Sequence, residues 1–435
     1  MSSVTIRPAK VGGQVAVPAS KSQTIRALII ASFAEGTSII NHPLDSGDTR
    51  SCLDACRALG ADITLEPERW SVRGIDLDKK VSRDPLVIDA GNSGTTLYLG
   101  LGAAASLGRP VIFTGDEQIR SRPLASLASS LQDLGAAIEI PPKELSLPPA
   151  LLEGSAPRMI TGPLTGGHTS ISCPTSQYLS GLLLACPMAK GESVIEVPLL
   201  HERPYVEMTL SWLDDQGITY SREGWTRFTL KGGERFHRFE SRIAGDFSSA
   251  SFFFCAAAVT GSTLEVTCLD KEDPQGDREI LTCLEQMGCR IRWHGSDRLT
   301  ITGPAGGRLT PAKLDLNAIP DTLPVLAVTA CFAEGTTVLE HVPQARIKET
   351  DRIAVMNREL TSLGARVEEL EEGLVIHGTG FLEGGAARGH GDHRVIMALA
   401  VAGLASRRGV SIDDTSAADI TVPGFFSLLD SIILP

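Results

Sequence analysis

The sequence is poor in aromatic residues and in positive charge. Only 5% of its 435 residues are Phe, Trp or Tyr, and its formal net charge is -12. Single-stranded nucleic acids bind on stacked aromatic side chains and on basic surfaces. The composition therefore argues against nucleic acid as a partner.

Long apolar segments are also absent. The first residues, MSSVTIRPAK, lack the apolar stretch of a secretory signal. The most apolar windows, Leu179–Ala189 and Phe252–Val259, are far shorter than the roughly 20 residues that span a bilayer. We therefore expect a cytoplasmic protein that does not enter the membrane.

Motifs for metals, nucleotides and nucleophilic triads are missing as well. The nine cysteines include no C-x-x-C pair, which indicates reduced, mostly buried thiols and neither disulfides nor zinc. No H-E-x-x-H motif is present, and GNSGTT at 91–96 lacks the order of a phosphate-binding P-loop. No Ser–His–Asp triad can be argued from these positions. The sequence predicts no metal site.

One pattern recurs six times along the chain. A polar cluster opens a helix rich in Ala and Leu, a strand of β-branched residues follows, and a second helix closes on a Gly. Glycine is expected there because only it enters the left-handed region cheaply. The length is too great for one core, so we predict an α/β fold of two similar domains, with helices inside and sheets outside. The first helices are expected to begin at Ser20, Asn92, Ser176, Asp246, Asp321 and Asp392. The closing glycines of the first five copies are Gly60, Gly135, Gly217, Gly288 and Gly364, and the sixth copy runs out near the C-terminus.

The polar residues at these helix starts allow two interpretations. Ser, Thr, Asn and Asp cap free N–H groups, which explains each start by itself. If the helices run parallel within a domain, however, their positive ends converge and attract anions. Since the protein as a whole is acidic, such a basic cleft would concentrate small acidic substrates.

The segment from Arg346 to Arg352, RIKETDR, packs five charges into seven residues. On a helix start, Lys348 and Arg352 would share one face, and Glu349 and Arg352 would lie a turn apart. A solvated helix with internal ion pairs is the alternative. Further arginines in Asp392-His393-Arg394 and in Arg120–Pro123 favour a doubly charged substrate, because Arg binds carboxylates and phosphates bidentately. We expect Arg394 to lower the pKa of His393, which weakens an acid role for that imidazole.

A series of motifs runs along the whole chain: PASKSQTIRA near the start, LDSGDT at 44–49, GNSGTT at 91–96, SRP at 121–123, TSQYLSGLL at 175–183, RPY at 203–205, GDFSSASFF at 245–253, IPD at 319–321, RIKETDR at 346–352 and GDHR at 391–394. In this order the motifs resemble the EPSP synthase family (3-phosphoshikimate 1-carboxyvinyltransferases), and the resemblance covers essentially the whole chain. It implies two inside-out α/β domains, each of three βαβαββ repeats, with a cleft between them. The implied domains are residues 1–19 plus 243–435 and residues 20–242, with the N-terminal strand paired in the former.

The resemblance also implies a set of site residues. Those for catalysis are Lys21, Asp321 and Glu349. Those for shikimate 3-phosphate are Lys21, Ser22, Arg26, Thr175, Ser176, Gln177, Tyr205, Asp321, Gln344 and Lys348. Those for phosphoenolpyruvate are Lys21, Asn92, Gly94, Arg122, Gln177, Arg352 and Arg394.

The implied activity is transfer of the enolpyruvyl group of phosphoenolpyruvate to the 5-hydroxyl of shikimate 3-phosphate, in aromatic amino acid biosynthesis. Asp321 resembles the base at the hydroxyl, and Lys21 and Glu349 resemble the groups that move protons at the methylene carbon. The family implies no metal and no organic cofactor. We expect a monomer whose partners are the two small substrates.

Three positions depart from the family pattern. Tyr98 lies where many members have an arginine, Glu202 where a serine often precedes RPY, and Ile420 where some members place a lysine. Ordinary drift is one interpretation, and weaker binding of phosphoenolpyruvate or inhibitors is the other. Because Gly94 is retained, we predict sensitivity to glyphosate-like analogues, which Ile420 would reduce.

Three alternatives stay open at this point. The first is the transferase that acts on UDP-N-acetylglucosamine, although the loop around Gly115–Pro123 lacks the cysteine of that family. The second is RNA 3′-phosphate cyclase, which the acidic charge disfavours. The third is a non-catalytic shikimate-phosphate binding protein, which would not need Lys21, Asp321 and Glu349 together.

Overall fold

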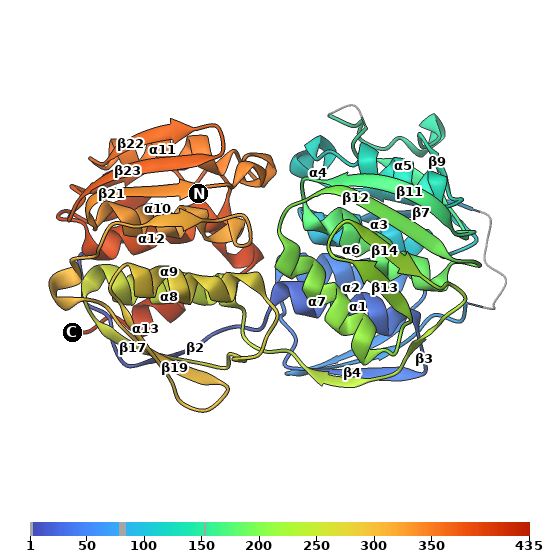
Figure 1. Ribbon diagram of the computed structural model, residues 1–435, viewed down its shortest axis with the longest axis horizontal. Helices are drawn as coiled ribbons and strands as arrows, with labels where there is room; N and C mark the ends of the chain where they lie inside the picture. Colours follow the sequence, from blue (N-terminus) through green and yellow to red (C-terminus); the bar gives the residue numbers. More distant parts are fainter. Residues whose placement is uncertain (1–2, 78–83, 152–153) are drawn as a thin grey trace. The chain divides into compact units, whose positions relative to one another are not determined.

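The computed structural model describes residues 3–77, 84–151 and 154–435 (Figure 1). The chain divides into two units. The first unit is Lys21–Ile243, and the second unit joins residues 3–20 to Ala244–Pro435. Each unit consists of three buried helices with sheets packed around them.

The central helices of the first unit are α1 (Lys21–Phe33), α3 (Gly94–Ala104) and α6 (Ser176–Ala185). Every residue of α3 is buried, and this helix packs against both α1 and α6. A helix that is apolar on all sides must be enclosed by other elements. The surrounding elements are α2 (Gly47–Leu59), α4 (Glu117–Ser121), α5 (Ala125–Asp133) and α7 (Arg203–Asp215), with the sheets β16-β4-β6-β5 (Glu240–Arg242, Thr37–Asn41, Arg69–Arg73, Asp62–Glu66), β7-β8-β10-β9 (Leu86–Asp89, Pro110–Thr114, Arg158–Thr161, Ala137–Glu139) and β11-β12-β14-β13 (Gly167–Cys173, Ser193–Leu200, Arg227–Leu230, Tyr220–Glu223), and the small pair β3 (Ala34–Glu35) and β15 (Phe236–His237).

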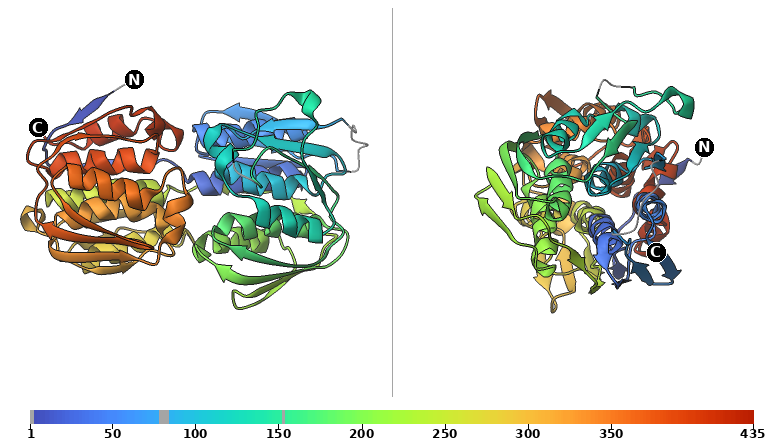
Figure 2. Two further views of the ribbon diagram at one scale, coloured as in Figure 1. Left: turned by 90° about the horizontal axis from the view of Figure 1, so that it is seen from above. Right: turned by 90° about the vertical axis from the view of Figure 1, so that its right-hand side faces the viewer.

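The second unit repeats this plan around α8 (Phe247–Thr260), α10 (Leu323–Cys331) and α12 (His393–Ala405). These three helices pack against one another, and Figure 2 shows the orange and red helices of this unit running side by side. The surrounding elements are α9 (Ile280–Gln286), α11 (Arg352–Ser362) and α13 (Phe425–Ser431), with the sheets β2-β17-β19-β18 (Gln14–Ala16, Thr263–Thr267, Arg298–Thr302, Arg290–Trp293), β20-β21-β23-β22 (Lys313–Asp315, Glu334–Glu340, Gly373–Thr379, Arg366–Leu370) and β1-β25-β24 (Val4–Ile6, Val410–Ile412, Gly385–Ala387).

The four-stranded sheets share one pairing pattern. The first strand pairs parallel with the second, and the second pairs antiparallel with the third, as in β7, β8 and β10. The same order holds for β20, β21 and β23 in the second unit. A parallel pair requires a crossover connection, and in both cases a buried helix, α3 or α10, supplies it. The predicted α/β fold with helices inside and sheets outside is confirmed.

Two strands pair with partners that are distant in the sequence but lie in the same unit. Strand β2, which precedes α1, pairs parallel with β17 of the second unit. Strand β16, which precedes α8, pairs parallel with β4 of the first unit. The N-terminal strand β1 completes the sheet of β25. Strands β1 and β2 thus pair with strands from the second half of the chain, and no sequence pattern indicated the placement of β16.

The predicted closing glycines all lie in the left-handed region, with φ between 66° at Gly217 and 119° at Gly60. Gly60 donates its N–H to the carbonyl oxygens of Arg57 and Cys56, which ends α2. A side chain there would be strained, so the choice of glycine follows from the backbone.

One local prediction was wrong. Lys348 and Arg352 do not share a helix face, because α11 begins only at Arg352. Asp351 accepts a hydrogen bond from the N–H of Ala354 at 3.0 Å and caps the helix there. Lys348 lies before this cap in extended backbone, after the 3-10 turn Pro343–Ile347.

All but one of the nine cysteines are buried, and Cys268 is half-buried, as predicted for thiols in the core. Burial raises the pKa of Cys289 to about 12, which makes this thiol unreactive at neutral pH. In the part of the chain that the structure describes, no helix is both long enough and apolar enough to cross a membrane.

Candidate functional site

Hydrogen bonds and an ion pair join the helix starts of the first unit. Lys21, which opens α1, lies with its Nζ 3.1 Å from Oδ2 of Asp48 in the first turn of α2. Thr96 of α3 donates to the backbone carbonyl of Asp48 at 3.4 Å. Gln177 of α6 donates from Nε2 to Oγ1 of Thr95 at 3.2 Å. The positive ends of these helices therefore meet, which favours an anionic ligand in the first unit.

Arg26 connects three of the residues expected at shikimate 3-phosphate. Its side chain is buried, and Nε donates to Oγ1 of Thr209 at 2.9 Å. Nη1 donates to the carbonyl of Ser22 at 3.0 Å, and Nη2 to the carbonyl of Tyr205 at 2.9 Å. The structure thus brings Ser22, Arg26 and Tyr205 together at the contact between α1 and α7.

Thr175 and Ser176, at the start of α6, contact the carboxylate of Glu202. Oε2 of Glu202 accepts from the N–H of Ser176 at 3.1 Å and from its hydroxyl at 2.8 Å. The Thr175 hydroxyl donates to the same oxygen at 3.3 Å. Glu202, noted in the sequence as a departure, therefore lies directly at two of the expected ligand residues.

Arg122 lies against the start of α3 because Gly94 has no side chain. A Cβ added at Gly94 would be only 2.5 Å from Nη1 of Arg122. The carbonyl of Pro123, the next residue, accepts from the hydroxyls of Tyr98 at 2.9 Å and Tyr178 at 2.6 Å. Tyr98 therefore fixes the backbone beside Arg122, which gives this departure a structural role.

Asn92 is bound to α4 through its side-chain amide. Its Nδ2 donates to Oδ2 of Asp116 at 2.5 Å and to Oε1 of Gln118 at 3.0 Å. Asp116 also caps α4 by accepting from the N–H of Ile119. Asn92 thus connects the loop before α3 to the loop that carries Arg122.

In the second unit, Arg352 forms ion pairs with three carboxylates. Its buried guanidinium lies 2.8 Å from Oδ1 of Asp321, 2.6 Å from Oε2 of Glu349 and 2.9 Å from Oδ2 of Asp392. Burial lowers the pKa of Arg352, but the three carboxylates outweigh it and raise that pKa above its ordinary value. The arginine is therefore a permanent cation that fixes the positions of Asp321 and Glu349.

Arg394 is the buried cation with the fewest contacts in this cluster. Its Nη2 lies 3.6 Å from Oδ2 of Asp321, and its guanidinium carbon lies 5.8 Å from the centre of the Phe252 ring. Within residues 3–77, 84–151 and 154–435, its Nε and Nη1 atoms have no hydrogen-bond partner. A buried donor without an acceptor is destabilising, so this guanidinium is suited to receive an anion.

Lys348 and Gln344 complete the expected ligands of the second unit. Nζ of Lys348 lies 3.9 Å from Oδ1 of Asp321. Gln344 is buried and donates from Nε2 to the carbonyl of Asn317 at 2.9 Å. Asp321 therefore faces three cations, those of Lys348, Arg352 and Arg394.

His393 cannot act as an acid near neutral pH. Its pKa is lowered to about 3, mainly by burial, which Glu349 opposes and to which the neighbouring Arg394 adds. The predicted direction is confirmed. Its main cause is burial, whereas the sequence argument relied on Arg394.

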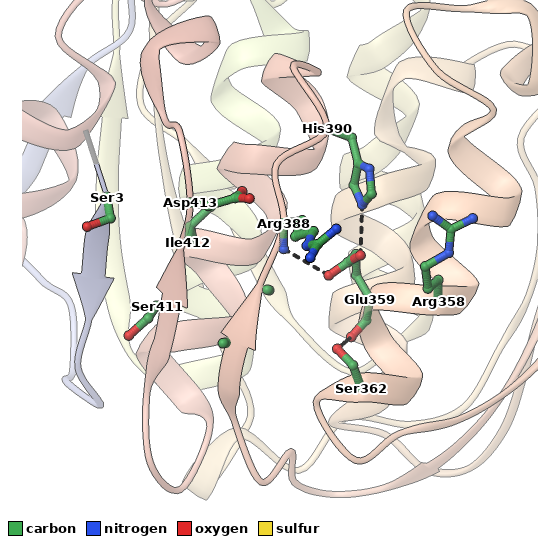
Figure 3. A pocket seen from close by; sticks show the side chains of 11 residues that line it. Ser3, Arg358, Glu359, Ser362, Arg388, His390, Ser411, Ile412 and Asp413 are labelled. Atoms are coloured by element: carbon green, nitrogen blue, oxygen red, sulfur yellow. Dashed lines mark hydrogen bonds and ion pairs between the residues drawn. The ribbon is translucent and has the colours of Figure 1, made fainter. Parts of the chain in front are cut away.

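A hollow of about 520 Å³ in the second unit borders the loop that leads into α12 (Figure 3). Glu359 contacts this loop: it accepts the N–H of Arg388 at 2.9 Å, and its Oε1 lies 2.8 Å from Nε2 of His390. None of the expected ligand residues lines the hollow. The hollow therefore lies beside the loop that Glu359 fixes just before Asp392, and it is separate from the expected ligand residues.

The comparison with protein families decides the relationship. The family model described as EPSP synthase (3-phosphoshikimate 1-carboxyvinyltransferase) matches residues 6–429. The chain belongs to the EPSP synthase family. This membership favours the family resemblance over the three alternatives that the sequence left open.

Relatives named 3-phosphoshikimate 1-carboxyvinyltransferase agree with this membership of the EPSP synthase family. The chain is 43% identical to the one from Ruminiclostridium cellulolyticum over 98% of its length and 97% of the relative's. It is 44% identical to the one from Acetivibrio thermocellus, over 98% and 96% of the two chains. The solved EPSP synthase from Acinetobacter baumannii superposes with a TM-score of 0.81 at 28% identity, over 99% of this chain and 98% of that one.

Sequence reasoning missed two carboxylates that position the expected ligands. Asp48 pairs with Lys21, and the motif LDSGDT gave no sign of that partner. Asp392 is fully buried and accepts from Nε of Arg352 at 2.9 Å and from the N–H of Arg394 at 2.9 Å. The sequence identified Asp392 as a helix cap, but its bond to Arg352 joins segments 40 residues apart.

Proposed function

We propose that this protein transfers the enolpyruvyl group of phosphoenolpyruvate to the 5-hydroxyl of shikimate 3-phosphate and releases phosphate. Membership of the EPSP synthase family supports the reaction. The observation that carries the site assignment is the buried guanidinium of Arg394, whose Nε and Nη1 have no protein acceptor in the described chain. A small substrate with a carboxylate and a phosphate would supply such acceptors.

Phosphoenolpyruvate is assigned to three arginines. Arg352 and Arg394 are buried cations that can bind carboxylate or phosphate oxygens. Arg122 joins them in this assignment, because the close approach to Gly94 presents its guanidinium at a helix start. Lys21, Asn92 and Gln177 complete the proposed set.

Shikimate 3-phosphate is assigned mainly to donors of the first unit. Ser22, Arg26 and Tyr205 are already joined by hydrogen bonds, and Thr175 and Ser176 present hydroxyls at the start of α6. The second unit contributes Asp321, Gln344 and Lys348 to this proposed set. Hydroxyls and amides suit a ring that carries several hydroxyl groups.

The proposed reaction is an addition followed by an elimination. Asp321 accepts the proton of the 5-hydroxyl while the hydroxyl oxygen of shikimate 3-phosphate bonds to C2 of phosphoenolpyruvate. Lys21 or Glu349 donates a proton to the methylene carbon. The resulting ketal then loses a proton from its methyl group, the C2–O bond to phosphate breaks, and the double bond forms again. Arg352 and Arg394 stabilise the negative charge of the departing phosphate. No step requires a metal or organic cofactor.

We also propose that the protein is a monomer in the cytoplasm. Light scattering of the purified protein tests the oligomeric state, and a mass of two chains would contradict it.

Release of inorganic phosphate from phosphoenolpyruvate tests the proposed reaction. The purified protein is incubated with phosphoenolpyruvate and either shikimate 3-phosphate or UDP-N-acetylglucosamine. We expect release only with shikimate 3-phosphate. Release only with the nucleotide sugar, or with neither acceptor, would overturn the proposed function.

A further inference from the structure

Glu202 is the carboxylate that occupies the start of α6. It is 2% exposed, and one of its oxygens accepts all three bonds from Thr175 and Ser176. Its backbone lies in the left-handed region, with φ 57° and ψ 42°, which is uncommon for a residue other than glycine. Glu202 is therefore an internal anion at a position where a helix N-terminus favours negative charge.

The same donors cannot serve this carboxylate and a substrate phosphate together. The N–H and the hydroxyl of Ser176 each carry one hydrogen, and both are directed to Oε2 of Glu202. A phosphate oxygen bound at these donors must therefore replace the carboxylate oxygen. Two anions side by side in a buried place would also repel each other strongly.

We propose that Glu202 is a specificity-determining residue that competes with shikimate 3-phosphate for the donors of Thr175 and Ser176, and that binding of the substrate displaces its carboxylate. This inference rests on the proposed function, which assigns those two residues to shikimate 3-phosphate. The presence of Glu202, where many family members have a serine, then lowers the affinity for the substrate. The protein binds its acceptor more weakly than the same site would without an internal anion.

A purely structural role for Glu202 makes the opposite prediction. If the carboxylate only anchors α6 to α7, its loss would misplace Thr175 and Ser176 and weaken the binding of shikimate 3-phosphate. Competition predicts that the loss of the negative charge tightens that binding. The direction of the change therefore separates the two roles.

Two variants test this with little disturbance of the backbone. Glu202→Gln keeps the shape of the side chain without its charge, and Glu202→Gly adopts the left-handed conformation readily. The matched control is Glu207→Gln, since Glu207 is on the same helix but pairs with Arg222 and is half-exposed. It removes one negative charge from α7 without contacting α6.

The measurements are isothermal titration with shikimate 3-phosphate alone and steady-state KM values for each substrate. We expect the Kd and KM for shikimate 3-phosphate to fall about tenfold in both Glu202 variants, because the substrate no longer has to displace a charged hydrogen-bond acceptor. The KM for phosphoenolpyruvate should change less than about twofold, and Glu207→Gln should match the wild type.

An unchanged or higher Kd for shikimate 3-phosphate in both Glu202 variants would overturn the inference. The failure of the proposed function is a different result: the wild-type protein would then release no phosphate from phosphoenolpyruvate with shikimate 3-phosphate. The two failures are therefore distinguished by the wild-type assay.

Discussion

Arg26 in the first unit donates hydrogen bonds to two carbonyls and two hydroxyls, whereas Arg352 in the second unit is held by three carboxylates. Backbone and hydroxyl oxygens fix the guanidinium of Arg26 where α1, α6 and α7 meet. The ion pairs of Arg352 keep it protonated and fix Asp321 and Glu349 in place. The comparison shows two ways of fixing a buried arginine, by neutral oxygens in the first unit and by carboxylates in the second, and two of those carboxylates are the proposed proton carriers Asp321 and Glu349.

The largest effect is expected at Asp321. Asp321→Asn keeps the size of the side chain but removes the proposed base, so kcat should fall by about a thousandfold. Binding of phosphoenolpyruvate, measured by titration, should persist, because Arg352 and Arg394 lose a competing anion. Asp315→Asn is the matched control, since Asp315 is exposed and pairs with His341. A kcat of Asp321→Asn within tenfold of the wild type would refute the assignment of Asp321 as the base.

The next effect concerns acid stability of the second unit. His393 has its pKa lowered to about 3 by burial, so only the unfolded chain takes up its proton between about pH 6.5 and pH 3. Its contribution to stability is present above pH 6.5 and is lost as the pH falls through that window, at roughly 1.4 kcal/mol per pH unit. His393→Gln should show a shallower loss of stability than the wild type in urea unfolding at pH 7, 6 and 5. If the free energy of unfolding falls equally with pH in both proteins, His393 is not buried in its neutral form.

A smaller effect is expected at the first unit. Gly94→Ala places a Cβ 2.5 Å from Nη1 of Arg122, so the flexible guanidinium must move. The KM for phosphoenolpyruvate should rise about tenfold, as for a weakened charged hydrogen bond, while the Kd of shikimate 3-phosphate stays the same. Gly108→Ala is the control, because its Cβ would meet nothing closer than 3.9 Å. An unchanged KM for phosphoenolpyruvate would remove Arg122 from the proposed set.

The features that the sequence predicted correctly depend on neighbouring residues. Gly60 adopts a left-handed conformation to end α2, and Asp246 caps α8 through the N–H of Ser249. Both signals are contained within a few residues, so a repeated pattern was enough to predict the α/β layers. Residue chemistry pointed to the arginines, Arg394 among them, as anion ligands, but the family resemblance supplied the individual roles and residues such as Lys21.

The features that the sequence missed depend on distant residues. Asp48 reaches Lys21 and Asp392 reaches Arg352 only after helices have packed together. The helix predicted around Lys348 failed because Asp351 competes as a cap and delays the start of α11. The pairing of β16 with β4 joins segments some 200 residues apart, which no periodicity reveals.

Identification of the product tests the central claim most directly. The protein is incubated with equal amounts of phosphoenolpyruvate and shikimate 3-phosphate, and the products are separated and identified by mass spectrometry. The account predicts one carboxyvinyl ether of shikimate 3-phosphate for each phosphate released. Release of phosphate together with free pyruvate, and with shikimate 3-phosphate unchanged, would contradict it.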